Sequence, residues 1–241
     1  MASSKIRLKN ISANHRNQEP KRTQCVRCGT CCLKGGPTLH LEDVDALEKR
    51  IIKRSDLYTI RQGETVFNNI EGETCVLAEE MIKIKGTKES YSCIFYDDIQ
   101  KGCTIYAHRP IECRVLRCWD TKGIEAISGK RRLCRKHLIP PDSPLAHIIA
   151  AHEQRCSYMT IETWIDKIAG PGATAAVERI IEALQFDHYL RPFIAKKFAL
   201  PIEEMDFFFG RPLTTTINMF GLQVEQEGET FLLTPMEDVA R

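Results

Sequence analysis

Residues 25–32 read Cys25-Val26-Arg27-Cys28-Gly29-Thr30-Cys31-Cys32, so four cysteines fall within eight positions in the pattern C-x2-C-x2-C-C. A C-x2-C turn places two sulfur atoms a few ångströms apart, and its backbone N–H groups can point at them. This geometry suits zinc as well as iron–sulfur clusters. Gly29 leaves the backbone free to adopt a positive φ inside the turn. The segment therefore predicts a metal site and leaves the metal open.

A second group of cysteines follows about sixty residues downstream. Eight thiols could supply two four-ligand sites, or one cluster with additional thiols beside it. Adjacent residues seldom direct both side chains at one ion, so Cys32 is expected to serve a second site or to lie beside the metal as a thiol. Whether Cys75, Cys134, His137 or Cys156 also ligates stays open. The predicted metal ligands are Cys25, Cys28, Cys31, Cys32, Cys93, Cys103, Cys113 and Cys118.

Length and composition are those of a globular protein. The chain has 241 residues, of which 43% are apolar and 27% charged, which suits one domain or two closely joined ones. No run of eighteen apolar residues predicts a membrane helix, and the polar N-terminus has no apolar signal core. We therefore expect a cytoplasmic, reducing location, because the spacing of the cysteines suits metal ligation better than a disulfide framework.

Positive charge is concentrated in the cysteine segments. Residues 1–37 carry eight Lys and Arg against one Glu, and residues 101–137 carry ten basic against three acidic residues, so each segment has net charge +7. Residues 201–241 have two basic and eight acidic residues, which gives −6. Cations near a thiolate-bound metal would stabilise its negative charge. Because no aromatic residues interleave with the basic ones, we expect no nucleic-acid partner.

The hydrophobic pattern predicts a mixed α+β fold. Residues 1–24 are expected to form a flexible basic arm, and residues 25–139 a cysteine-cluster domain. Within that domain we expect a helix at 39–54 capped by Thr38, strands at 74–77 and 81–84, and a helical turn at 111–119. Strands at 92–96 and 103–106 would form a hairpin that brings Cys93 close to Cys103.

Residues 140–241 are predicted to be a mainly helical region that packs on the cysteine domain or on a protein partner. Pro140, Pro141 and Pro144 indicate the boundary. Helices are expected at 143–156, at 160–169 with Thr160 as cap, and at 174–185 and 187–198. Residues 214–220, 222–226 and 230–234 have strand character, and the last two predict a terminal hairpin.

Two segments together resemble a known family. The pattern C-x2-C-x2-C-C is followed by Cys93 and then by C-x-I-Y-x-x-R-P-x-x-C-R over residues 103–114, with Cys118 after it. This combination resembles the YkgJ-type cysteine-cluster proteins, which are described as zinc- or iron-chelating, and is similar to a module of the flagellin lysine-methylase FliB. The resemblance covers residues 20–120. It implies that the later cysteines are ligands and singles out Arg109 and Arg114, which could hydrogen-bond cluster sulfur or a bound anion, or form ordinary salt bridges.

Three functions agree with this sequence. The first is an iron–sulfur protein with one or two 4Fe-4S clusters, acting in electron transfer or in support of a protein-modification reaction. The second is a structural zinc module that binds a protein partner through residues 140–241. The third is a methylase-type enzyme, against which we note the absence of a glycine-rich S-adenosylmethionine loop in the sequence. We favour the first, and the sequence leaves open whether the chain catalyses a reaction.

Overall fold

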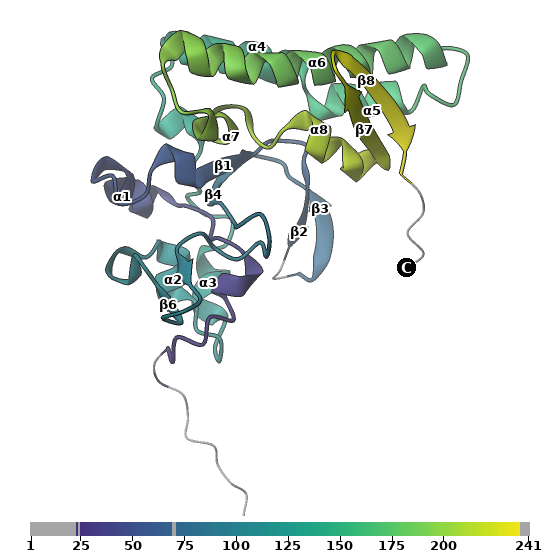
Figure 1. Cartoon of the computed structure of the whole chain (residues 1–241). Helices are drawn as coiled ribbons and strands as arrows, with labels where there is room; N and C mark the ends of the chain where they lie inside the picture. Colours follow the sequence, from purple (N-terminus) through teal and green to yellow (C-terminus); the bar gives the residue numbers. More distant parts are fainter. Residues whose placement is uncertain (1–22, 24, 69–70, 237–241) are drawn as a thin grey trace, which may run out of the picture.

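The computed structural model describes residues 23, 25–68 and 71–236, and it has a mixed α+β fold, as predicted. Figure 1 shows short strand pairs and cysteine-bearing segments in one part, with the long helices α4 and α6 across the top and a terminal hairpin beside α6. The predicted arm at 1–24 lies outside the described residues, apart from Thr23. Within these residues, none of the helices combines the length and the apolar composition that a membrane span requires.

Short antiparallel strand pairs build the first half. β1 (Leu57–Ile60) pairs with β4 (Met81–Ile84), and β2 (Thr65–Asn68) pairs with β3 (Glu73–Val76), so the strands expected at 74–77 and 81–84 are confirmed. β1 and β4 are mostly buried, because apolar side chains occupy both of their faces.

The helix expected at 39–54 is much shorter than predicted. A 3₁₀ turn at Leu41–Asp43 leads into α1 (Val44–Glu48), and Arg50 then adopts a φ of +56°, which ends helical geometry. This turn brings Ile52 into the core, where it is 1% exposed. Thr38 does not cap the helix. It bridges to Lys83 on β4, and His40 takes the capping position.

The hairpin expected near Cys93 is reduced to β5 (Tyr96–Asp97) and β6 (Gly102–Cys103). Cys93 lies before it, because the backbone N–H of Cys93 donates to the carbonyl of Cys32 at 2.8 Å. The turn predicted at 111–119 is α2 (Ile111–Val115). α3 (Lys122–Ile127) follows and was not predicted.

The second half is helical, with several corrected boundaries. α4 (Pro144–Arg155) matches its prediction, whereas α5 (Tyr158–Ile165) is capped by Ser157 and not by Thr160. The two helices expected at 174–185 and 187–198 are one helix, α6 (Ala173–Phe198). After α7 (Met205–Phe209), residues expected as a strand form α8 (Leu213–Thr216) and a 3₁₀ turn. The terminal hairpin is confirmed as β7 (Leu222–Glu227) and β8 (Thr230–Pro235).

One apolar core joins residues from both sides of the predicted boundary at 139/140. Leu39, Ile82 and Leu133 from the first half pack in the same cluster as Ile194 and the run Phe207–Phe209. A second cluster around Ile161, Ile180 and Leu184 lies between α5, α6 and the terminal hairpin. The first cluster includes Cys93, so the cysteine region is packed directly on the main core.

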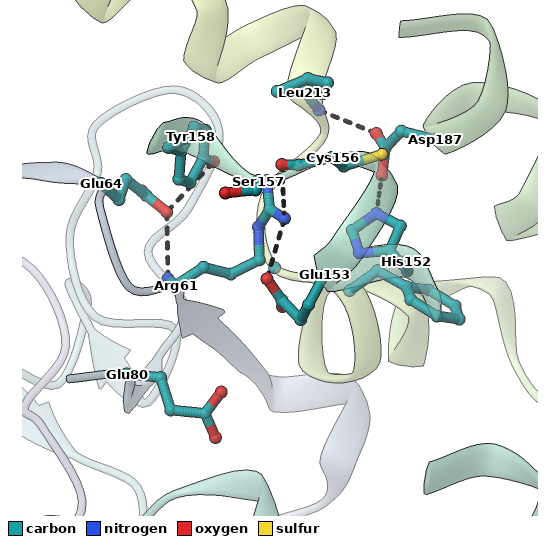
Figure 2. A network of polar contacts seen from close by, with 12 residues as sticks. Arg61, Glu64, Glu80, His152, Glu153, Cys156, Ser157, Tyr158, Asp187 and Leu213 are labelled. Atoms are coloured by element: carbon teal, nitrogen blue, oxygen red, sulfur yellow. Dashed lines mark hydrogen bonds and ion pairs between the residues drawn. The ribbon is translucent and has the colours of Figure 1, made fainter. Parts of the chain in front are cut away.

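Buried charges form a second link between the two halves. Arg61, at the end of β1, is 1% exposed and donates to Glu153 on α4 at 3.2 Å and to the carbonyl of Cys156 at 3.1 Å (Figure 2). Arg135 joins Glu80 to the same Glu153 carboxylate. Removing one member would leave a buried charge uncompensated, so this network fixes α4 relative to β1.

Candidate metal centre

The cysteine loop is shaped by two residues with positive φ and by close contact with β5. Arg27 has φ +56° and Gly29 has φ +77°. A Cβ atom at Gly29 would lie 2.2 Å from Oη of Tyr96, the first residue of β5. The loop then closes with a hydrogen bond from Leu33 N–H to the Gly29 carbonyl at 2.9 Å. The backbone path predicted for Gly29 is therefore observed, and only a residue without a side chain fits beside Tyr96.

Five of the eight predicted ligands lie within electrostatic reach of one another. The sulfur atoms of Cys31 and Cys32 lie 3.9 Å apart. Cys31, Cys93 and Cys113 lie close enough to Cys32 for their negative charges to raise its pKa. The charge of Cys103 likewise raises the pKa of Cys93 and of Cys113. These residues come from the loop, the segment before β5, β6 and α2, and we call them the thiol cluster: Cys31, Cys32, Cys93, Cys103 and Cys113.

The thiol cluster has the electrostatics of a site that needs a cation. A hydrogen bond with the Cys32 thiol lowers the pKa of Cys31 to about 6, and the pKa of Cys32 rises because of the same bond. Burial raises the pKa of Cys93, Cys103 and Cys113, with repulsion from neighbouring thiolates adding to it. Several thiolates cannot ionise together here without a compensating charge, which a bound metal supplies.

Two basic side chains lie beside the cluster. Arg109, which the family resemblance singled out, lies close enough to lower the pKa of both Cys31 and Cys103. Lys83 on β4 acts likewise on Cys93, and burial lowers the pKa of Lys83 itself. Lys83 was not predicted as a site residue, because a single lysine in the alternating strand Met81–Ile84 is typical of a solvent-facing position.

Tyr106 links the cysteine loop to the second motif. The guanidinium carbon of Arg109 lies 3.6 Å from the centre of the Tyr106 ring, and that of Arg27 lies 4.2 Å from it. Each contact is a cation–π interaction. Arg114, the other arginine singled out by the resemblance, is about half exposed, and its Nη2 lies 3.9 Å from Asp43. An interaction of either arginine with a cofactor stays a prediction.

Two carboxylates position α2, which carries Cys113. Asp43 accepts hydrogen bonds from the backbone N–H groups of Ile111 and His40 at 2.8 and 2.9 Å. Glu112 accepts from Thr38 N–H at 2.8 Å and lies 3.3 Å from His40 Nε2. Sequence reasoning did not include these residues, although Glu112 precedes Cys113 directly. Their bonds fix the orientation of α2, as outer partners of metal ligands commonly do.

The remaining predicted ligands do not complete a site in this structure. Cys25, Cys28 and Cys118 are exposed. In residues 23, 25–68 and 71–236, no group of three or more His, Cys, Asp or Glu has the spacing of a metal site, and this includes the thiol cluster. Cys28 Sγ lies 3.2 Å from Thr30 Oγ1. Ligation by the predicted set stays a prediction.

The open candidates have local partners. Cys134 Sγ donates to the Glu80 carbonyl at 3.2 Å, and His137 Nδ1 accepts from Cys134 N–H at 3.0 Å. Cys156 is 0% exposed and belongs to the second core cluster.

Comparison with known proteins also points to a cysteine-cluster domain. Residues 24–135 match the model of the family CxxCxxCC, described as "Putative zinc- or iron-chelating domain". The resemblance to cysteine-cluster proteins that the two motifs predicted is confirmed by this match. The match covers slightly less than half of the chain. Neither the curated proteins nor the solved structures searched gave a match to the chain.

Proposed function

We propose that residues 25–139 bind an iron–sulfur cluster that serves electron transfer or supports a protein-modification reaction in the cytoplasm. The observation that carries this proposal is the convergence of five thiols from four separate segments of the chain. We propose Cys31, Cys32, Cys93, Cys103 and Cys113 as the inner ligand set. Cys25, Cys28 and Cys118 would complete it through movement of their exposed segments.

Positive charge beside the thiols supports the choice of an iron–sulfur cluster. The number of thiols does not separate the two metals, because a zinc site and a 4Fe-4S cluster each take four cysteine ligands. A thiolate-bound cluster carries negative charge, and Lys83 and Arg109 lie where they would offset it. When bound, the cluster would supply one-electron redox chemistry, while the chain orients the thiols and shields Cys93 from solvent.

Metal and acid-labile sulfide content of the full chain, purified without oxygen, tests this proposal. Iron and sulfide in equal amounts, with broad visible absorption that reduction bleaches, are the expected result. Four or eight irons per chain would distinguish one 4Fe-4S cluster from two. Zinc without sulfide would contradict the iron–sulfur proposal and leave a structural zinc module, which the family description also allows.

A half-buried cysteine of the thiol cluster and a buried cysteine outside it give a matched comparison. We expect Cys113→Ser to weaken metal retention by more than about ten-fold, because losing a ligand should exceed the effect of losing an outer partner. Cys156→Ser should load fully, because the Cys156 thiol donates to the Ala183 carbonyl at 3.6 Å, away from the thiol cluster. The metal content per folded protein is measured for both variants. Full loading of Cys113→Ser would exclude Cys113 from the site.

A further inference from the structure

The outer face of α6 carries an aromatic stripe that the metal site does not use. Phe186, Tyr189, Leu190 and Phe193 follow the i, i+3, i+4, i+7 spacing of one helix face. With Gln185 and with Glu229 of the β7–β8 turn, they line a groove of about 570 Å³. Tyr189 is 44% exposed and Phe193 58%. The opposite face of α6 is buried in the two cores, and Phe186 and Leu190 are partly buried against them. The exposed apolar surface of the stripe is therefore mainly that of Tyr189 and Phe193.

Charges of opposite sign stand at the two ends of this stripe. Glu182 lies one helical turn before Phe186. Its side chain is 60% exposed and forms a solvent-exposed ion pair with Arg179 at 2.9 Å. Lys197 lies one turn after Phe193, with Nζ 5.6 Å from the centre of the Phe193 ring. Along the helix face the order is therefore acid, phenylalanine, tyrosine with leucine, phenylalanine, base.

Two copies of this helix face complement each other when they lie antiparallel. If a second α6 lies antiparallel, with the twofold axis between Tyr189 and Leu190, Phe186 faces Phe193 and Glu182 faces Lys197. Tyr189 then faces Leu190, and every contact occurs twice, as an isologous interface requires. A partner with charge of one sign would match one end of the stripe and be repelled by the other.

We propose that the outer face of α6 is a homodimer interface, in which two copies of this chain pair antiparallel through the Phe186–Phe193 stripe. The proposal gives the protein partner expected for residues 140–241 a specific identity, a second copy of the chain. The dimer proposal depends on α6 alone, so it can be tested independently of the metal that the thiol cluster binds.

Charge reversal on the full-length protein tests the pairing. Sedimentation over a concentration series should give a dimer for the wild type. Glu182→Lys and Lys197→Glu should each weaken dimerisation about ten-fold, because each creates two like-charge pairs across the axis. The double variant Glu182→Lys/Lys197→Glu restores opposite charges and should return the dissociation constant to near the wild-type value.

Controls separate this interface from general effects of charge. Glu162→Lys, on an exposed position of α5, should leave the mass unchanged. Phe193→Asp should give a monomer with an unchanged circular dichroism spectrum, because this side chain is mostly exposed. A wild type that is monomeric at every concentration would overturn the proposal. So would a dimer that ignores the single reversals, or a double variant no stronger than the singles.

Discussion

Gly29 is the residue at which the cysteine loop comes closest to β5. Its φ of +77° costs an alanine about 1–2 kcal/mol, and the added Cβ would also meet the Tyr96 hydroxyl at 2.2 Å. We expect Gly29→Ala to lower the free energy of unfolding by about 2–4 kcal/mol and to reduce metal content, because the loop must move away from β5. Urea unfolding and metal analysis measure the two effects.

Gly72 provides the control for the backbone contribution. It has a similar φ of +74°, and among the described residues no atom lies within 4 Å of the Cβ that an alanine would add. Gly72→Ala should therefore cost about 1–2 kcal/mol and leave metal content unchanged. Equal losses in the two variants would show that contact with Tyr96 does not constrain the loop.

His152 is buried in the polar network of Figure 2, and it makes stability depend on pH. Its Nε2 lies 2.7 Å from Asp187 Oδ1, and its Nδ1 has no hydrogen-bond partner among the described residues. Burial lowers the pKa of His152, although the bond to Asp187 opposes this shift. The folded protein therefore keeps His152 neutral at a pH where the unfolded chain already binds a proton.

We expect the free energy of unfolding to fall as the pH drops below about 6.5, by at most about 1.4 kcal/mol per pH unit from this group. His152→Gln can still donate to Asp187 but does not titrate, so its stability should decline less between pH 7 and pH 5. Urea unfolding of both proteins over this range measures the difference. Parallel curves would contradict a neutral buried His152.

At the scale of elements, α6 contains a proline that weakens it. Pro192 lies within the 26-residue helix, is exposed, and has no N–H for the helical hydrogen bond. Pro192→Ala should raise the free energy of unfolding by about 1–2 kcal/mol, since the bond gained outweighs the greater freedom of the unfolded chain. Chemical denaturation at low protein concentration tests this. A loss of stability would mean that packing around α6 depends on the proline.

The single helix α6 also shows where sequence patterns fail. Asp187 resembles the start of a second helix, because aspartate is a common N-cap. In the structure its carboxylate is buried, where it accepts hydrogen bonds from Leu213 N–H at 2.8 Å and from Arg191 Nη2 at 2.8 Å. Arg191 lies one helical turn away in α6, whereas Leu213 lies 26 residues away in sequence, where a local pattern cannot reveal it. By contrast, Ser143 was correctly placed at the start of α4, because its cap bond to Ala146 N–H spans three residues.

The candidate site divides in the same way. The candidate cysteines could be singled out from the sequence because their spacing is a local pattern, and their ligation stays a prediction. Lys83, Asp43 and Glu112 could not, because their roles depend on β4 and α2 lying beside the cysteine loop. The core shared by the two halves could not be predicted from the sequence either. Apolar periodicity indicates that Phe207 is buried, but it does not indicate that Phe207 packs with Leu39.

For the whole molecule, the consequence of this shared core is coupled unfolding. The thiol cluster contributes Cys93 to the same core as Ile149, Ile194 and Phe208, and Glu153 on α4 joins Arg61 and Arg135 of the first half. Losing the metal should therefore destabilise both halves together, because metal binding stabilises the folded state to which the site belongs.

We expect calorimetry to show one unfolding transition for the loaded protein. After chelation, that transition should move down as a unit, by roughly 2–4 °C for each kcal/mol of binding free energy lost. As a control, Ile99→Lys should leave the unfolding curves of the loaded and the chelated protein unchanged, because this side chain is 95% exposed. Two separate transitions, with one unaffected by chelation, would contradict coupling. They would show that residues 140–241 fold independently of the cysteine domain, and the buried contacts of Arg61 and Arg135 would then count as a docking surface between two units.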